Sequence, residues 1–79
     1  VHVLVIPKRG IPRLVDAAAD DQDLLGHLLL AAGRVAEQLG VQDAFRLIIN
    51  NGSGAGQTVF HLHLHIIAGK AFAEGHMAG

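Results

Sequence analysis

Three stretches of this chain have the dense apolar, β-branched composition of strands. They are residues 1–6, residues 45–50 and a longer run over about residues 58–68. Short runs of this kind, bounded by glycine, proline or polar residues, are typical of strands. The first run ends at Pro7, and a glycine-rich loop, residues 51–56, lies between the second and the third. Because the first residue already lies inside a strand pattern, we expect a further N-terminal portion of the parent domain.

A helix is predicted between the first two strands, over about residues 20–39. Asp20, Asp21 and Asp23 supply a cap and negative charge in the first turn, where the helix dipole favours it. Gly40 stands where a glycine commonly ends a helix. Apolar residues recur at three- and four-residue spacing and give the helix one apolar face: Leu24, Leu25, Leu28, Ala32, Val35, Ala36 and Leu39.

The order strand, helix, strand, loop, strand indicates the α+β class, with one main helix on an antiparallel sheet. Residues 1–70 form the predicted domain, and residues 71–79 are a weakly patterned C-terminal tail. A domain of this size buries only about 60% of its unfolded surface and is marginally stable alone. The chain contains no cysteine, so neither disulfides nor thiolate–metal sites can stabilise it. Association with a second subunit is the remaining way to stabilise a domain of this size.

The composition favours a homodimer. Hydrophobic residues make up 51% of the chain and charged residues only 16%, which leaves apolar surface for a subunit interface. Gly26 and Gly33 each cost the helix about 1 kcal/mol relative to alanine. We expect the close approach of a neighbouring sheet or subunit to compensate for this cost.

Charge and hydropathy argue against two classes of partner. The formal net charge is −1, whereas a nucleic-acid footprint normally requires a basic excess. No apolar run approaches the roughly 20 residues of a membrane span, and no signal-peptide pattern opens the chain. The expected location is cytoplasmic.

Histidine and leucine alternate without a break over residues 61–65. On a strand, successive side chains point to opposite faces, so His61, His63 and His65 share one face and the leucines share the other. Phe60 extends the apolar side of the pattern, and we expect it in the core. Three adjacent imidazoles on the opposite face have no packing rationale, so they indicate chemistry.

The residues around the histidines favour the chemistry of a phosphate-like anion. Glycines in residues 51–56 let backbone N–H groups approach a ligand and form a concave anion site. Asn50 and Thr58 add neutral donors, and imidazole can act as nucleophile, base or cationic donor near neutrality. Phosphoryl chemistry rewards positioned donors and an aligned nucleophile. The loop does not end as a Walker loop does.

Metal binding and a purely structural role stay open from the residues alone. His61 with His63, or His63 with His65, could ligate one ion as neighbours on a face. The outer pair lies about 13 Å apart along a strand, whereas Zn–N bonds are about 2.0–2.1 Å long. No aspartate, glutamate or cysteine lies in the strand to complete a ligand shell.

At this point the residues resemble a known family. Residues 56–67, Gly-Gln-Thr-Val-Phe-His-Leu-His-Leu-His-Ile-Ile, closely resemble the histidine-triad (HIT) signature. Residues 2–8, His-Val-Leu-Val-Ile-Pro-Lys, resemble the strand that carries a fourth histidine in the same superfamily. Residues 24–28 and 46–50 are similar to the Hint branch in particular. The resemblance runs from His2 to about residue 70 and implies the HIT fold, with the sheet extended across a homodimer.

The resemblance also implies roles for single residues. The middle histidine, here His63, matches the family nucleophile, which attacks the α-phosphate of a nucleotide and is transiently nucleotidylated. The backbone carbonyl of His61 matches the acceptor that orients this nucleophile. His65 matches a phosphate donor, Thr58 a hydroxyl near the leaving group, and His2 the fourth, supporting histidine. No metal or other cofactor is implied.

The implied substrate is a purine nucleoside 5′-phosphoramidate or a related nucleotide conjugate, and the implied activity is hydrolysis. Histidine rather than glutamine at the third triad position is typical of the hydrolases of the superfamily. The residues that match the phosphate contacts are Asn50, Gly56, Gln57, Thr58, His63 and His65. In the family, the residues that hold the nucleoside come from strands before this chain's first residue. A non-catalytic nucleotide-binding protein is therefore the main alternative, and a metal-binding protein is a further one.

Four other polar residues are given no role in the predicted chemistry. Lys8 and Arg9 are expected in a solvated turn, and His27 is expected at the exposed surface of the helix. His76 lies in a segment without a supporting pattern and is given no role. Gly10 stands where the resembling family commonly has a histidine.

Overall fold

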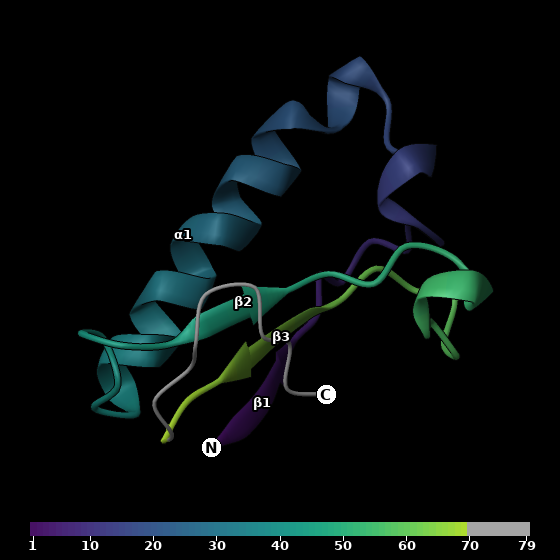
Figure 1. Ribbon diagram of the computed structural model, residues 1–79. Coiled ribbons are helices and arrows are strands. Elements are labelled where there is room, and N and C mark those ends of the chain that lie inside the picture. The colour runs from purple at the N-terminus through teal and green to yellow at the C-terminus, as the bar shows by residue number, and fades with distance from the viewer. Residues whose placement is uncertain (70–79) are drawn as a thin grey trace.

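The computed structural model describes residues 1–69 and has a sheet of short strands beside one long helix (Figure 1). Along the chain, the elements are β1 (His2–Val5), α1 (Gln22–Gln38), β2 (Arg46–Ile48) and β3 (Leu64–Ile67). Three short 3₁₀ helices complete them: η1 (Leu14–Asp16), η2 (Ala19–Asp21) and η3 (Ser53–Ala55). The predicted tail, residues 71–79, lies outside the described residues, and so does His76.

Strand β3 is the central strand of the three-stranded sheet, with β1 on one side and β2 on the other. Both pairings are antiparallel. His65 lies opposite Leu4 on one side and Ile48 on the other. The α+β class with one main helix on an antiparallel sheet is confirmed. The extension of the sheet across a homodimer stays a prediction.

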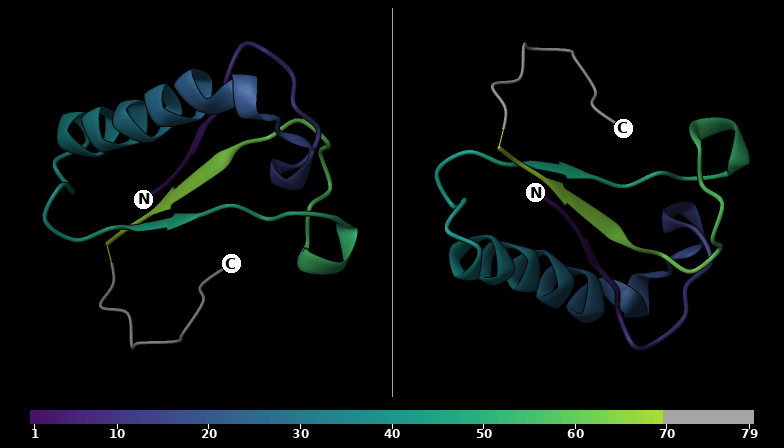
Figure 2. Two further views of the ribbon diagram at one scale, coloured as in Figure 1. Left: turned by 90° about the horizontal axis from the view of Figure 1, so that it is seen from above. Right: turned by 90° about the horizontal axis from the view of Figure 1, so that it is seen from below.

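Helix α1 lies along one face of the sheet, and the core forms between them (Figure 2). The buried members of the core are Ile11, Leu28, Ala32, Leu62, Leu64 and Ile66. Leu64 is 1% exposed and Ile66 is 0% exposed, so the leucine side of the alternation is the core side. The histidines of residues 61–65 consequently lie on the other side and are half-buried.

The start of α1 differs from the prediction. The helix begins at Gln22 and is preceded by η2. Asp21 is buried, and its carboxylate accepts a hydrogen bond from the Ala18 N–H at 2.9 Å and pairs with Arg9 at 2.8 Å. Its carboxylate therefore holds the preceding turn and the segment after β1 together. Arg9, expected in a solvated turn, is bound to this carboxylate. The glycine end of the helix is confirmed, since Gly40 has φ +73°.

The third strand is shorter than predicted. The pattern predicted residues 58–68, but only Leu64–Ile67 pair with neighbouring strands. The reason lies in β1, which ends at Val5 and is followed by Pro7, a residue without an N–H. The second strand is also shorter than predicted. It covers Arg46–Ile48 rather than residues 45–50.

The core position predicted for Phe60 is wrong, because its side chain is 50% exposed. The chain bends at residues 59–61, so the alternation that points leucines inward does not extend back to Phe60. The predicted apolar face of the helix also included Leu39, but this residue is exposed.

The two helix glycines have no close neighbour within the described chain. A Cβ atom at Gly26 or Gly33 would meet nothing within 4 Å. The predicted approach of the sheet to these glycines is therefore wrong, and both face open space on α1.

Candidate active site

His63, directly before β3, is held by a hydrogen bond to the backbone two residues earlier in the chain. Its Nδ1 lies 2.7 Å from the carbonyl oxygen of His61. A carbonyl oxygen only accepts, so the proton of this bond is on Nδ1. The other ring nitrogen, Nε2, then carries a free lone pair in the neutral ring. This arrangement is what a nitrogen nucleophile requires.

The ring of His61 points to the end of β1. Its Nε2 donates to the carbonyl oxygen of Pro7 at 2.9 Å. The backbone N–H of the next residue, Leu62, donates to the carbonyl oxygen of Ile11 at 2.6 Å. The segment that carries His63 is therefore attached to the loop after β1, although it is outside the sheet ladder.

His65 and His2 form a direct imidazole pair across β3 and β1. Their facing nitrogens, Nδ1 of His65 and Nε2 of His2, lie 2.8 Å apart. The ring centroids of His65 and His63 lie 5.0 Å apart, with the rings inclined by 62°. Nε2 of His65 is buried and has no partner within the described chain. The structure thus brings all four predicted histidines into one connected group.

Burial lowers the pKa of His65 below its ordinary value of 6.5, and the charges of protonated His63 and His2 lower this pKa further. The neutral ring is therefore favoured by the folded state. The resulting stability is present above the unfolded pKa, near 6.5, and is lost as the pH falls through the lower folded pKa.

We expect the free energy of unfolding to fall as the pH is lowered from about 7.5 to about 5. Urea unfolding at several pH values measures this dependence. His65→Gln removes the titrating ring and should flatten the profile, whereas His27→Gln, at the exposed face of α1, should leave it unchanged. An equally steep profile in His65→Gln would assign the dependence to other groups.

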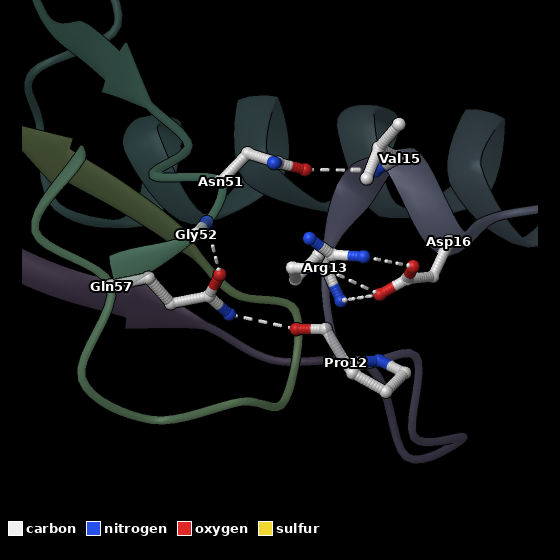
Figure 3. A network of polar contacts seen from close by, with 7 residues as sticks. All are labelled: Pro12, Arg13, Val15, Asp16, Asn51, Gly52 and Gln57. Carbon is white, nitrogen blue, oxygen red and sulfur yellow. Dashed lines mark hydrogen bonds and ion pairs between the residues drawn. The ribbon is translucent and has the colours of Figure 1, made fainter. Parts of the chain in front are cut away.

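The glycine-rich loop is tied to the rest of the domain by the side chain of Gln57, which is 3% exposed. Its Oε1 accepts from the Gly52 N–H at 2.7 Å, and its Nε2 donates to the carbonyl oxygen of Pro12 at 2.7 Å (Figure 3). The same Nε2 also donates to the carbonyl oxygen of Val59 at 3.0 Å. One amide thus connects both ends of the loop to the segment before η1. Asn51 adds a second link, because its Oδ1 accepts from the Val15 N–H at 2.9 Å.

Gln57→Met keeps the length of this side chain but removes its three hydrogen bonds. Each buried group left without a partner costs about 1–3 kcal/mol. Because water can reach part of the loop, we expect the free energy of unfolding to fall by about 2–4 kcal/mol. Chemical denaturation checks this value against Gln38→Met, at the exposed end of α1. Equal stability of the two variants would contradict a bracing role for Gln57.

The remaining predicted residues lie in or beside this loop. Gly56 is exposed and has φ +93°, a conformation that favours glycine, and Thr58 is also exposed. Asn50 follows β2 and is half-buried. The sequence predicted a backbone contact for Gln57 but missed the bracing role of its side chain. A long amide directly after a glycine-rich loop is the signal that could have indicated it.

An open pocket lies beside His63. Its volume is about 250 Å³, and it is lined by Leu4, Ile6, Val59, His61 and His63. Apolar side chains from β1, from the residue after it and from residue 59 therefore line this pocket together with His63.

Two negative observations concern the described residues 1–69. They contain no group of three or more histidine, cysteine, aspartate or glutamate side chains arranged to hold a metal ion. None of their helices is long and apolar enough to cross a membrane.

An antiparallel α+β domain with a connected set of histidines is the arrangement that the structure shows. Comparison with known proteins identifies the family that shares it. The HIT domain family matches residues 1–72. An uncharacterized HIT-like protein of Synechocystis sp. is 60% identical over 73 residues, covering 92% of this chain and 64% of that protein. An uncharacterized HIT-like protein of Synechococcus elongatus is 49% identical over the same shares.

Solved structures agree in fold. A HIT family hydrolase from Clostridium thermocellum matches with a TM-score of 0.89 and 41% identity, covering 98% of this chain and 68% of that chain. A HIT family hydrolase from Legionella pneumophila matches with a TM-score of 0.88 and 37% identity, covering 94% and 67%. The chain belongs to the HIT family. It spans 64% of the length of the curated relatives it matches.

Proposed function

We propose that this protein is a nucleotide-binding hydrolase that cleaves purine nucleoside 5′-phosphoramidates, or related nucleotide conjugates, through a nucleotidyl-histidine intermediate. The observation that carries the proposal is the hydrogen bond of 2.7 Å between His63 Nδ1 and the His61 carbonyl. It leaves Nε2 as the free nucleophilic nitrogen of a ring whose orientation is set. The family membership and the hydrolases among the structural relatives support it.

The reaction would proceed in two displacements. Nε2 of His63 attacks the α-phosphorus, the bond from phosphorus to the leaving nitrogen or oxygen breaks, and the leaving group takes up a proton. Water then attacks the phosphorus and gives up a proton, the bond between nitrogen and phosphorus breaks, and a nucleoside monophosphate leaves. Splitting one displacement into two steps with an aligned nucleophile is the usual advantage of covalent catalysis. No metal or other cofactor enters this scheme.

The other site residues would bind and orient the phosphate. In this proposal, His65 and Thr58 contact the phosphate and the leaving group, and His2 supports His65 through the imidazole pair of 2.8 Å. Asn50 and the backbone N–H groups of Gly56 and Gln57 provide further donors. Oriented donors of this kind act on the charge that develops on phosphate oxygens in the transition state.

The test uses adenosine 5′-phosphoramidate as the probe. We expect release of the monophosphate and, after rapid quenching in denaturant at alkaline pH, where a phosphorus–nitrogen bond to histidine survives, a mass increase of one nucleotidyl group on His63. Binding of adenosine monophosphate without turnover would favour the alternative of a non-catalytic nucleotide-binding protein. Absence of both binding and turnover would remove the proposal.

We also propose that the protein forms a homodimer in which the sheet extends from one subunit to the other and the outer face of α1 contributes to the interface. Leu30 is 66% exposed, Leu29 is also exposed, and Gly26 and Gly33 leave open space beside them. Small residues next to exposed leucines allow close packing of a second helix. The cytoplasmic location expected from the sequence stays a prediction.

Sedimentation equilibrium checks the dimer. We expect the mass of two chains for the unmodified protein and a shift toward one chain for Leu30→Glu, because a buried carboxylate at the interface is costly. Val15→Glu places the same charge at an exposed apolar position outside α1 and should leave the mass of two chains unchanged. A monomeric unmodified protein would contradict the homodimer.

A further inference from the structure

The peptide unit between His61 and Leu62 takes part in two hydrogen bonds. Its carbonyl oxygen accepts from Nδ1 of His63 at 2.7 Å. Its N–H, contributed by Leu62, donates to the carbonyl oxygen of Ile11 at 2.6 Å. The nucleophile is thus the inner end of a chain of hydrogen bonds that starts in the loop after β1.

The same loop holds the ring of His61. Nε2 of His61 donates to the Pro7 carbonyl oxygen at 2.9 Å. A Cβ atom placed at Gly10 would lie 3.8 Å from the His61 ring, so the loop also passes close to the side of this ring. Ile11 is buried in the core, which fixes the position of its carbonyl group. Residue 61 is therefore held through its side chain and through the peptide that follows it.

These bonds have a direct consequence for His63. Hydrogen bonds in a chain polarise one another, so donation by the Leu62 N–H makes the His61 carbonyl a stronger acceptor. A strong and fixed acceptor keeps the proton of His63 on Nδ1 and leaves Nε2 free. If the peptide could rotate, the ring would lose both its orientation and its preferred tautomer.

We propose that the loop of residues 7–11 positions the imidazole of His63, with His61 as the positioning residue. The Pro7 carbonyl holds the side chain of His61, and the Ile11 carbonyl holds the N–H of Leu62. Together they fix the peptide whose carbonyl accepts from His63. The predicted effect on the tautomer rests on geometry alone. The predicted effect on turnover rests on the proposed function.

The experiment compares two substitutions of His61 in the full chain. His61→Phe keeps a ring of similar shape but has no donor for the Pro7 carbonyl. His61→Gln carries an amide N–H at a comparable distance along the side chain and can restore that bond. His27→Phe is the matched control, because it makes the same change at the exposed surface of α1. Should His61→Phe fail to fold, His61→Met supplies a flexible side chain without a donor.

Long-range ¹H–¹⁵N spectra of the free protein measure the tautomer of His63. We expect a dominant Nδ1–H tautomer in the unmodified protein and in His61→Gln, and a mixture of both tautomers in His61→Phe or His61→Met. Turnover of adenosine 5′-phosphoramidate should show a fall in kcat of about 10- to 100-fold in the donor-free variants, with KM nearly unchanged. His61→Gln should recover most of it.

A dominant Nδ1–H tautomer in every variant would overturn the inference. So would the same mixture in His61→Gln as in His61→Phe, because the restored donor would then have no effect. The spectra require no substrate, so they decide the inference even if the protein proves not to hydrolyse phosphoramidates.

Discussion

His63→Ala is expected to abolish the nucleotidylated intermediate and to lower kcat by about 10³-fold or more. The alanine side chain has no nitrogen to attack phosphorus. No other imidazole of the group donates from Nδ1 to the carbonyl oxygen of the residue two positions earlier. His65 is bonded to His2, and the ring of His61 is bonded to Pro7. The neighbouring histidines therefore cannot replace it without rearrangement.

The measurement combines steady-state turnover with intact mass after quenching. The fold should survive, because His63 is half-buried, directly precedes β3 and is not part of the core. His27→Ala, on the exposed face of α1, is the control and should retain full activity. Turnover by His63→Ala within a few-fold of the unmodified protein would end the assignment of His63 as nucleophile.

Ile66→Ala is expected to cause the largest loss of stability. Ile66 is 0% exposed and lies in the central strand, between the partner residues Val3 and Leu47 and against α1. Truncating a buried isoleucine removes the transfer free energy of its methyl groups and leaves a cavity, at a cost of about 2–5 kcal/mol. For a domain of this size, such a loss is a large share of the total stability.

Chemical denaturation at one protein concentration measures this difference, since association makes stability depend on concentration. Ile6→Ala is the matched control, because Ile6 loses the same atoms but is 54% exposed. We expect the control to change the free energy of unfolding by less than about 1 kcal/mol. Comparable losses at the two positions would mean that the core is not where the structure places it.

Periodicity predicted the elements because burial follows periodicity. The three- and four-residue spacing placed Leu28, Ala32 and Ala36 on the buried side of α1, and these are its buried residues. The alternation in residues 61–65 likewise placed the leucines inward and the histidines together. Both are local rules, in which side-chain direction depends only on the backbone conformation.

Element ends followed long-range contacts and were predicted less well. Residues 58–63 have strand-like composition but lie outside the sheet, because β1 ends before Pro7 and leaves no strand beside them. The exposed position of Phe60 has the same origin. The N-terminal turn of α1 depends on Arg9, which lies in another segment and pairs with Asp21.

The sequence by itself determined the α+β class, the buried and chemical sides of the histidine stretch, and the resemblance to the HIT family, because these depend on neighbouring residues and on an ordered motif. The resemblance also implied that the His61 carbonyl orients His63, but only the tertiary structure decided which groups hold His61, Leu62 and Gln57. His61, Leu62 and Gln57 each donate a hydrogen bond to a backbone carbonyl of residues 7–12. A backbone carbonyl is common to every residue type, so no pattern of side chains reveals which one will accept a hydrogen bond.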